Sequence, residues 1–274
     1  MPAGLREWIA YAAGEVSLRE PLRLRERLDV LDRLELHAES SGDAELLMRA
    51  EVLRANFEEI NRSLYAALRQ DIRAGKNALA PWIDALETAP EGDGYDDRDD
   101  LVSGVLALDE PDDVAPLPPD MVFYQPTPAR HIFELIRRAG LSERDVVMDL
   151  GSGLGIVPML VAATTAARAV GIEREQAYVD AAQRCAENLG VARVAFECRD
   201  AREADFSKAT LFYLYTPFTG EVMRSVLGAI RFEADRRPVR IATFGPCTEV
   251  IAAESWVRAD GMASAKRLTL FQVD

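Results

Sequence analysis

Apolar residues recur every three or four positions through the first ninety residues, the period of an amphipathic α-helix. After a short leucine stripe, a longer one is made of Leu46, Ala50, Leu53, Phe57, Ile60, Leu64, Leu68 and Ile72. Gly42-Asp43 and Gly75 bound the longer stripe, as helix start and stop signals do, and Ser17 and Glu20 have the spacing of a capping box. We therefore predict an all-α N-terminal domain over residues 1–90. Its long stripe either packs on a neighbouring helix or forms a surface for homodimerisation or partner binding.

The next thirty residues are acidic and rich in proline. Residues 91–120 hold four prolines and eleven acidic residues against a single basic one, Arg98. Like charges repel each other, and outside residues 101–108 few apolar side chains are present to build a core. We predict a partly disordered acidic linker over 91–120. The alternative is an acidic patch that receives a basic substrate.

From residue 121 to residue 274, short apolar runs alternate with amphipathic stretches. The runs predict strands over residues 145–150, 169–172, 194–198, 210–215, 239–243 and 268–273. The stretches between them predict helices over 127–139, 156–165, 176–188 and 219–232. Strands that alternate with helices form a mostly parallel sheet covered on both faces, so the predicted fold class is α/β, Rossmann-like and doubly wound.

Composition narrows the classes of function. The 274 residues are 49% hydrophobic and 28% charged, and no apolar run approaches the ~20 residues of a membrane-spanning helix. The N-terminus lacks the basic and then apolar regions of a signal peptide, so we expect a cytoplasmic protein. Three cysteines and two histidines are too few and too scattered for a disulfide framework or a clustered metal site.

The net charge of −14 disfavours nucleic acid and anionic membranes as partners, since both attract basic surfaces. This charge is unevenly placed. Residues 1–120 hold 13 basic against 27 acidic residues, whereas residues 121–274 hold 19 of each. The acidity therefore belongs to the first part of the chain and says little about a ligand of the second part.

The strongest chemical signal is a glycine-rich turn between the first predicted strand and the next helix. It reads Asp149-Leu-Gly-Ser-Gly-Leu-Gly155, and glycines let the backbone turn tightly and approach a ligand. Glu173 ends the next strand, 22 residues after Gly151, close to the spacing of an acid that hydrogen-bonds ribose hydroxyls. Asp200 follows the third strand. Three successive strands therefore each bring one carboxylate to the same edge of the sheet.

These acids argue against a dinucleotide. Asp149 would repel a pyrophosphate, and glycines at 151, 153 and 155 do not follow the GxGxxG spacing of the nicotinamide fingerprint. A nucleoside that carries an amino-acid tail suits all three acids, with ribose at Glu173, an adenine amine at Asp200 and an ammonium group near Asp149. S-adenosylmethionine is such a ligand, and we predict it as the cofactor.

Residues 121–274 resemble a class I, seven-strand S-adenosylmethionine-dependent methyltransferase. The glycine turn corresponds to the first motif of that family, Glu173 to the acid that ends its second strand, and Asp200-Ala201 to its adenine contact. The resemblance implies a seven-strand sheet whose last strand is antiparallel. It also implies a set of cofactor-binding residues, which are Thr127, Asp149, Gly151, Ser152, Gly153, Glu173, Arg174, Asp200, Ala201 and Tyr215.

Within that class, the chain is similar to a branch that contains the nucleosomal histone-lysine methyltransferase and the ATP synthase c-subunit lysine methyltransferases. The likeness rests on Tyr124-Gln-Pro-Thr-Pro128, on the Asp-Leu-Gly-Ser-Gly form of the glycine turn, and on residues 209–218. It departs at the end of the fourth strand, where Tyr215-Thr-Pro-Phe218 replaces an Asn-Asn-Phe or Leu-Pro ending. In the family that end borders the transferred methyl group, which leaves the acceptor open. The chain also lacks the Asn/Asp-Pro-Pro-Tyr motif of base and glutamine N-methyltransferases.

The resemblance implies methyl transfer, in which the protein mainly has to place an acceptor in line with an activated methyl group. The aromatic candidates for the catalytic site are Tyr124, Tyr215 and Phe218, because an aromatic site favours a neutral amine and tolerates a methylated cation. Tyr215 is equally explained as a core residue of its strand. We expect a nitrogen acceptor on a protein side chain or an amine metabolite. The alternatives are O-methylation of a small molecule or a peptide-derived natural product, and a catalytically silent cofactor-binding scaffold.

Overall fold

The computed structural model describes residues 4–85, 91–111, 114 and 120–273. The C-terminal half is built around one seven-stranded sheet with the strand order β3-β2-β1-β4-β5-β7-β6. The first five strands are parallel, whereas β7 pairs antiparallel with both β5 and β6. This arrangement confirms the predicted α/β fold and the antiparallel last strand. The strands are β1 (Val146–Leu150), β2 (Arg168–Glu173), β3 (Val194–Cys198), β4 (Leu211–Tyr215), β5 (Arg240–Phe244), β6 (Val257–Ala259) and β7 (Thr269–Val273).

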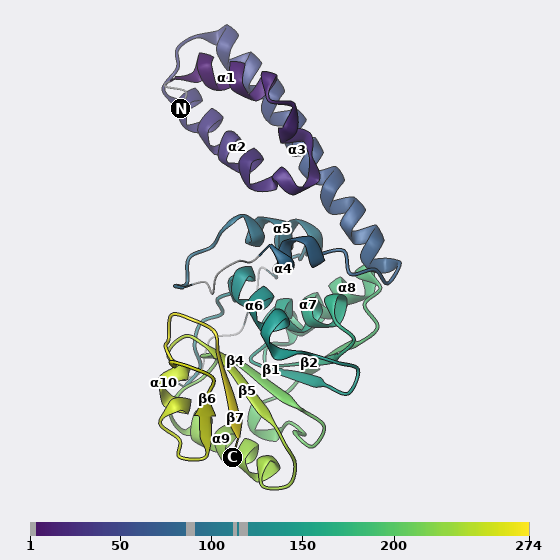
Figure 1. Ribbon diagram of the computed structural model, residues 1–274, viewed down its shortest axis with the longest axis vertical. Helices are drawn as coiled ribbons and strands as arrows, with labels where there is room; N and C mark the ends of the chain where they lie inside the picture. The colour runs from purple at the N-terminus through teal and green to yellow at the C-terminus, as the bar shows by residue number, and fades with distance from the viewer. Residues whose placement is uncertain (1–3, 86–90, 112–113, 115–119, 274) are drawn as a thin grey trace.

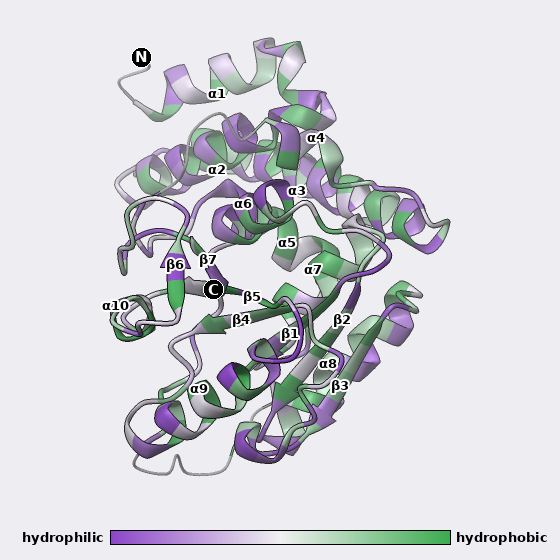
Figure 2. Ribbon diagram, turned by 60° about the horizontal axis from the view of Figure 1, so that its bottom comes forward, coloured by the Kyte–Doolittle hydropathy of each residue, from purple (hydrophilic) through white to green (hydrophobic). Residues whose placement is uncertain are grey.

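Helices cover both faces of the sheet, as Figure 2 shows. On one face lie α6 (Ala129–Ala139), α7 (Ile156–Thr164) and α8 (Gln176–Leu189), and on the other α9 (Gly220–Ala234) and α10 (Cys247–Ala252). Successive side chains of β4 alternate between two cores: Tyr213 packs in the core under α6 to α8, whereas Phe212 and Leu214 pack in the core under α9. Both faces of the strands are thus buried, which explains their nearly continuous apolar runs.

Two short elements of the sheet domain were not predicted. β6 has three residues with partly or fully exposed side chains, and α10 has six residues. Neither is long enough to show a hydrophobic period in the sequence. β6 exists because β7 offers it a pairing edge, which is a tertiary relationship.

The N-terminal region is a separate bundle of α1 (Leu5–Gly14), α2 (Leu24–Glu39) and the first part of α3 (Ala44–Arg73). Its core is built from Leu5, Trp8, Ile9, Ala12, Leu18, Val30, Leu34, Ala50 and Phe57. Figure 1 shows that the bundle projects from the sheet domain and that α3 alone runs back toward α8. Asp43 begins α3 as predicted, since its side chain accepts hydrogen bonds from the Glu45 and Leu46 amides.

The long apolar stripe of α3 is covered within the chain. Its first half packs on α1 and α2, and Leu64, Leu68 and Ile72 join the core of the sheet domain. The structure therefore supports packing on neighbouring helices, and a homodimer contact would need another surface than this stripe. The predicted capping box at Ser17 is wrong. Glu15 instead caps a short 3₁₀ turn by accepting from the Ser17 amide, and α2 begins only at Leu24.

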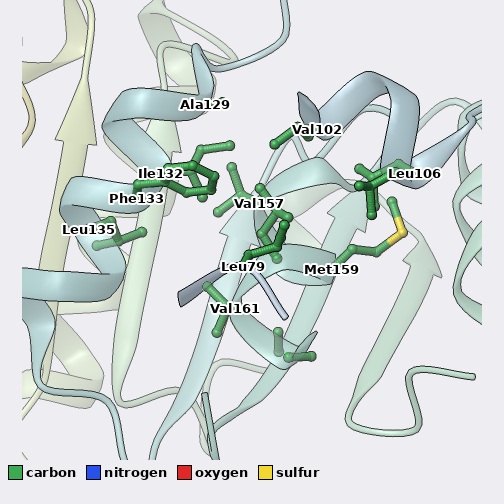
Figure 3. Close-up of a cluster of buried hydrophobic side chains, with 14 of the residues drawn as sticks. Leu79, Val102, Leu106, Ala129, Ile132, Phe133, Leu135, Val157, Met159 and Val161 are labelled. Carbon is green, nitrogen blue, oxygen red and sulfur yellow. The ribbon is translucent and has the colours of Figure 1, made fainter. Parts of the chain in front are cut away.

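Part of the predicted acidic linker is a packed helix, α5 (Asp97–Leu106). Asp96 and Asp99 form a capping box at its start, and Leu101, Val102, Val105 and Leu106 are buried. Figure 3 shows Val102 and Leu106 in one cluster with Leu79, which precedes α4 (Ala80–Asp84), and with residues of α6 and α7. The expectation of a linker was wrong for this stretch. Its acidic residues lie in the first turn of a helix, where the partial positive charge of the helix N-terminus stabilises them. Of the remaining linker residues, 112–113 and 115–119 lie outside the described residues.

Within the described ranges, no helix has both the length and the apolar content needed to cross a bilayer.

Candidate active site

A large cavity lies at the carboxyl ends of β1, β2 and β4, and its volume is about 710 Å³. That volume falls in the range of small-molecule sites, and this edge of a parallel sheet is where ligands of such folds bind. Its walls include eight of the predicted site residues. Those predicted residues that line it are Tyr124, Gly151, Glu173, Arg174, Asp200, Ala201, Tyr215 and Phe218.

The glycine turn reaches this cavity at Gly151. Gly151, Gly153 and Gly155 all have positive φ angles, of 79°, 51° and 74°, a region that other residues rarely adopt. The amides of Gly151 and Ser152 both donate to the carbonyl of Ile172 at 2.8 and 3.0 Å, which ties the turn to the end of β2. The turn is thus held next to Glu173, which follows Ile172.

Two carboxylates flank the glycine turn. Asp149, on β1, is only 4% exposed, and no hydrogen bond to its carboxylate is found in the parts of the chain that the structure describes. Burial raises the pKa of Asp149 well above its usual range, and the charge of Glu173 raises it further. Glu173 is well satisfied, since it accepts from the amides of Gly153 at 2.8 Å, Arg174 at 2.7 Å and Glu175 at 2.9 Å. A buried carboxyl group without a donor is the arrangement that a cationic ligand group would complete.

The third predicted acid is engaged by an arginine. Asp200 accepts from Arg202 Nε at 2.9 Å and from Arg202 Nη2 at 2.7 Å, one bond to each carboxylate oxygen. These hydrogen bonds are the main reason why the pKa of Asp200 lies below its usual value. Ala201 begins a short 3₁₀ turn beside it and also lines the cavity. A ligand amine at Asp200 would therefore compete with Arg202.

Aromatic side chains form the remaining wall. The rings of Tyr124 and Tyr178 pack at 5.1 Å between centroids, and those of Tyr215 and Phe244 at 4.8 Å. Burial raises the pKa of Tyr215 to about 12, with smaller contributions from Tyr95 and Asp93. Burial also raises the pKa of Tyr124, and Glu110 and Asp149 add to the shift. Both phenols therefore stay protonated at neutral pH.

Four of the predicted residues do not line the cavity: Thr127, Asp149, Ser152 and Gly153. The Thr127 hydroxyl is buried and pairs with the Tyr213 hydroxyl at 3.0 Å, beneath the aromatic wall. Phe218 borders the cavity but is almost entirely packed in the core under α9. Ser152 is buried in the glycine turn. Thr127, Phe218 and Ser152 support the walls more than they present an exposed surface.

Sequence reasoning missed several lining residues, chiefly Phe123, Gln176, Tyr178, Arg199, Thr216 and Pro217. One signal could have found Gln176 and Tyr178: they open the helix after Glu173, so they lie at the same sheet edge. Thr216 and Pro217 were recognised only as part of an unusual strand ending. Phe123 carries no pattern, because its place at the cavity depends on how the segment before α6 crosses the sheet.

The site has features that fit S-adenosylmethionine. Ser152 Oγ is buried and has no hydrogen-bond partner among the described residues, and the Asp149 carboxyl group is buried at the end of β1. Both adjoin the glycine turn. Glu173 and Asp200 also present carboxylate oxygens to the cavity. This set of groups suits a ligand that carries an ammonium, hydroxyls and an amine.

Comparison with known proteins agrees with this chemistry. The family model described as "Histone methylation protein DOT1" matches residues 122–210, less than half of the chain. No curated protein sequence matches. An RNA methyltransferase from Salinibacter ruber, solved in complex with S-adenosyl-L-homocysteine, is 29% identical, with 54% of this chain and 94% of that chain covered and a TM-score of 0.45. A SAM-dependent methyltransferase from Geobacter sulfurreducens, also in complex with S-adenosyl-L-homocysteine, is 28% identical, with 41% and 46% covered and a TM-score of 0.34.

The family match begins just before α6 and ends at the start of β4, so it covers the glycine turn and the strand ends that carry Glu173 and Asp200. The strand order, with its antiparallel last pair, extends the same fold to the end of the chain. The strand order, the glycine turn with its flanking carboxylates and the family match are similar to those of class I S-adenosylmethionine-dependent methyltransferases.

Proposed function

We propose that this enzyme methylates an amine nitrogen on a cationic substrate, such as a lysine side chain of a protein. One observation carries the proposal: the wall of the cavity beside the glycine turn is formed by tyrosines with neutral hydroxyls. Carboxylates surround these tyrosines, and the described lining residues include no histidine. The family match to a histone methylation protein supports the same acceptor class.

We infer the roles of the cofactor-binding residues from their chemistry. Glu173 accepts hydrogen bonds from ribose hydroxyls, Asp200 from the adenine amine once Arg202 has moved, and Asp149 lies near the ammonium group. Ser152 supplies its free hydroxyl to the amino-acid tail. When bound, S-adenosylmethionine supplies a methyl group that its sulfonium already activates. The remaining task of the protein is to hold an acceptor nitrogen in line with that group.

The proton balance favours nitrogen over oxygen. A phenol or an alcohol would need a nearby base, and Tyr215, with a pKa of about 12, holds its own proton. An amine only has to lose its proton before it enters, and an aromatic wall disfavours the charged ammonium form. Once methylated, the cation is stabilised by the faces of Tyr215 and Tyr124.

Electrostatics around the mouth also favour a cationic substrate. Burial is the main cause of the raised pKa of each of the three tyrosines, and nearby carboxylates raise it further. These carboxylates are Asp93 for Tyr215, Glu110 for Tyr124, and Glu173 with Glu110 for Tyr178. Such a field attracts a positive group during encounter, and the attraction weakens as salt is added. The Michaelis constant for the acceptor should therefore rise with ionic strength.

Two measurements test the proposal. Calorimetry with S-adenosylhomocysteine should show binding to the full chain and none to a double variant, Asp149→Ala with Glu173→Ala. A second double variant, Glu187→Ala with Glu221→Ala, removes two exposed carboxylates elsewhere and should bind normally. Binding that survives the first double change would contradict the cofactor assignment.

The acceptor is tested by transfer of a labelled methyl group to lysate fractions and to polylysine. Acid hydrolysis of the labelled product should release methylated lysine or another N-methyl amine. Label found only in esters or phenol ethers would overturn the nitrogen proposal in favour of O-methylation. Binding without transfer to any fraction would identify a silent scaffold.

A further inference from the structure

The turn after β4 contains a strained residue that the proposed mechanism does not yet use. Thr216 has a φ angle of +41° although it is a β-branched residue, and such residues are rarely found in the left-handed region. It also precedes Pro217, which further restricts its backbone. Strain of this kind persists only where the surroundings hold the residue in place, and it is concentrated at functional sites.

Cys247, the first residue of α10, holds Thr216 in that conformation. The Thr216 amide donates to Cys247 Sγ at 3.3 Å, and the Cys247 amide donates to Thr216 Oγ1 at 3.0 Å. Thr216 Oγ1 in turn donates to the carbonyl of Phe244, which ends β5, at 3.4 Å. Cys247 is 1% exposed. Burial raises the pKa of its thiol, so the sulfur keeps its proton and can donate to the Phe244 carbonyl while it accepts from Thr216.

The same turn is enclosed on both sides by glycines. A Cβ atom at Gly245 would lie 2.8 Å from Thr216 Oγ1 and 2.9 Å from Tyr215 Cε2. On the opposite side, a Cβ atom at Gly151 would lie closer than 3.0 Å to Pro217 Cβ. The turn therefore packs closely between the glycine turn after β1 and the loop after β5.

Tyr215, Thr216 and Pro217 all line the cavity. We propose that Cys247 is a positioning residue for methyl transfer: through Thr216, it fixes Tyr215 and Pro217 relative to the glycine turn, and so relative to the methyl group. This inference rests on the proposed function, since it assigns Tyr215 to the methyl-transfer side of the cavity. Cys247 itself does not line the cavity and touches no reacting atom.

The test compares Cys247→Ala, Cys247→Ser and a control, Cys185→Ala. Cys185 is also a buried thiol that bonds to a carbonyl, Leu106 O at 3.2 Å, but it lies on α8 and does not line the cavity. The measurements are the melting temperature, the dissociation constants of S-adenosylmethionine and S-adenosylhomocysteine by calorimetry, and kcat and KM for transfer to polylysine. With Tyr215 on the methyl-transfer side, its ring face would stabilise the positively charged sulfonium but not the neutral thioether. The ratio of the two dissociation constants therefore reports the position of Tyr215 without any acceptor.

We expect Cys247→Ala to lower kcat about tenfold, which is the loss of one well-placed interaction in the transition state. Its KM and its affinity for S-adenosylhomocysteine should stay within twofold, and its preference for S-adenosylmethionine should fall about threefold. Cys247→Ser should recover most of kcat and of the preference, because a hydroxyl can also accept from the Thr216 amide. Cys185→Ala should lower the melting temperature by a similar amount without changing either quantity.

If Cys247→Ala and Cys185→Ala behave alike, the positioning role is wrong while the methyltransferase proposal stands. If the unaltered protein binds neither cofactor form, the proposed function itself fails, and the positioning role with it. If the unaltered protein binds both forms but does not act on polylysine, the ratio of dissociation constants alone decides the role of Cys247.

Discussion

Gly151 and Pro217 pack so closely that a methyl group at Gly151 would lie less than 3.0 Å from Pro217 Cβ. Gly151 belongs to the turn after β1 and Pro217 to the turn after β4, and these two strands are neighbours in the sheet. The glycine turn, to which we assign cofactor binding, and the turn after β4, to which we assign the acceptor, therefore meet at this contact. Glycine is required at position 151 for two reasons: the Pro217 side chain leaves no space for a Cβ atom, and the φ angle of Gly151 is positive.

We expect Gly151→Ala to be more destabilising than Gly75→Ala, although the φ angles of the two glycines are +79° and +75°. At Gly75 nothing lies within 4 Å of the added Cβ, so only the left-handed backbone is penalised, by roughly 1–2 kcal/mol. At Gly151 the contact with Pro217 adds roughly 1–3 kcal/mol of overpacking. Urea unfolding of both variants measures the difference. Equal losses of stability in the two variants would show that Pro217 moves aside without a penalty in free energy.

The stability of the ligand-free protein should depend on the protonation of Asp149. Burial raises the pKa of Asp149 in the folded protein, and Glu173 adds to the shift, so the folded state holds a proton that the unfolded state releases. Between the unfolded pKa of about 3.9 and the higher folded pKa, the free energy of unfolding falls as the pH rises. Asp149→Asn removes this loss and should raise the melting temperature at pH 8 more than at pH 5, while it weakens cofactor binding.

Asp145 provides the opposite control. Burial raises the pKa of Asp145, but hydrogen bonds from Ser142 and Thr210 and the charge of Arg240 outweigh burial and hold this pKa below its usual value. Its contribution to stability is therefore present at neutral pH and is lost as the pH falls below about 4. Asp145→Asn should be destabilising at pH 7, and the difference from the unaltered protein should shrink as the pH is lowered. Parallel pH trends in the two variants would contradict both assignments.

Arg27 should be essential for the N-terminal bundle. Its side chain is 0% exposed and donates to Asn61 Oδ1 at 2.7 Å and to the carbonyls of Leu18 at 2.8 Å and Glu20 at 2.5 Å. Arg27→Met would leave these buried acceptors without donors, which costs roughly 1–3 kcal/mol for each unsatisfied group. Hydrogen exchange should then speed up in α1 and α2 while the central strands stay protected.

The matched change for Arg27 is Arg23→Met. Arg23 forms an exposed ion pair with Glu26, and such pairs are worth roughly 0–1 kcal/mol. It should leave the exchange of α1 and α2 nearly unchanged. A comparable loss of protection in both variants would mean that charge, and not the buried hydrogen bonds of Arg27, holds the bundle.

The Asp200–Arg202 pair should compete with the cofactor. Because both carboxylate oxygens of Asp200 accept from Arg202, a ligand amine has to displace the arginine. A partly exposed pair is worth roughly 0–1 kcal/mol, so Arg202→Ala should tighten binding of S-adenosylhomocysteine by up to about fivefold. Calorimetry measures this, with Arg224→Ala, which breaks an ion pair on α9, as the control. Weaker binding in Arg202→Ala would indicate that the arginine holds Asp200 in its binding conformation.

Much of the sheet domain could be predicted because its signals are local. The apolar run of β3 was assigned to its exact bounds, Val194–Cys198, and β2 and α8 to within a residue or two. The three acids follow from the same pattern, since a parallel sheet brings the carboxyl ends of its strands to one edge. The helix α5 is not evident from the sequence because a high net charge also indicates disorder, whereas the acids there cap a helix whose opposite face is buried.

The sequence by itself determined the order of strands and helices, the glycine turn and the carboxylate at the end of each of the first strands. These are set by hydrophobic period, backbone freedom and residue chemistry, which act over a few residues. Only the tertiary structure decided that Thr127 pairs with Tyr213, that Arg202 occupies Asp200, and that Cys247 holds Thr216. Each of these contacts joins segments whose approach depends on the packing of the whole sheet, and no local pattern encodes it.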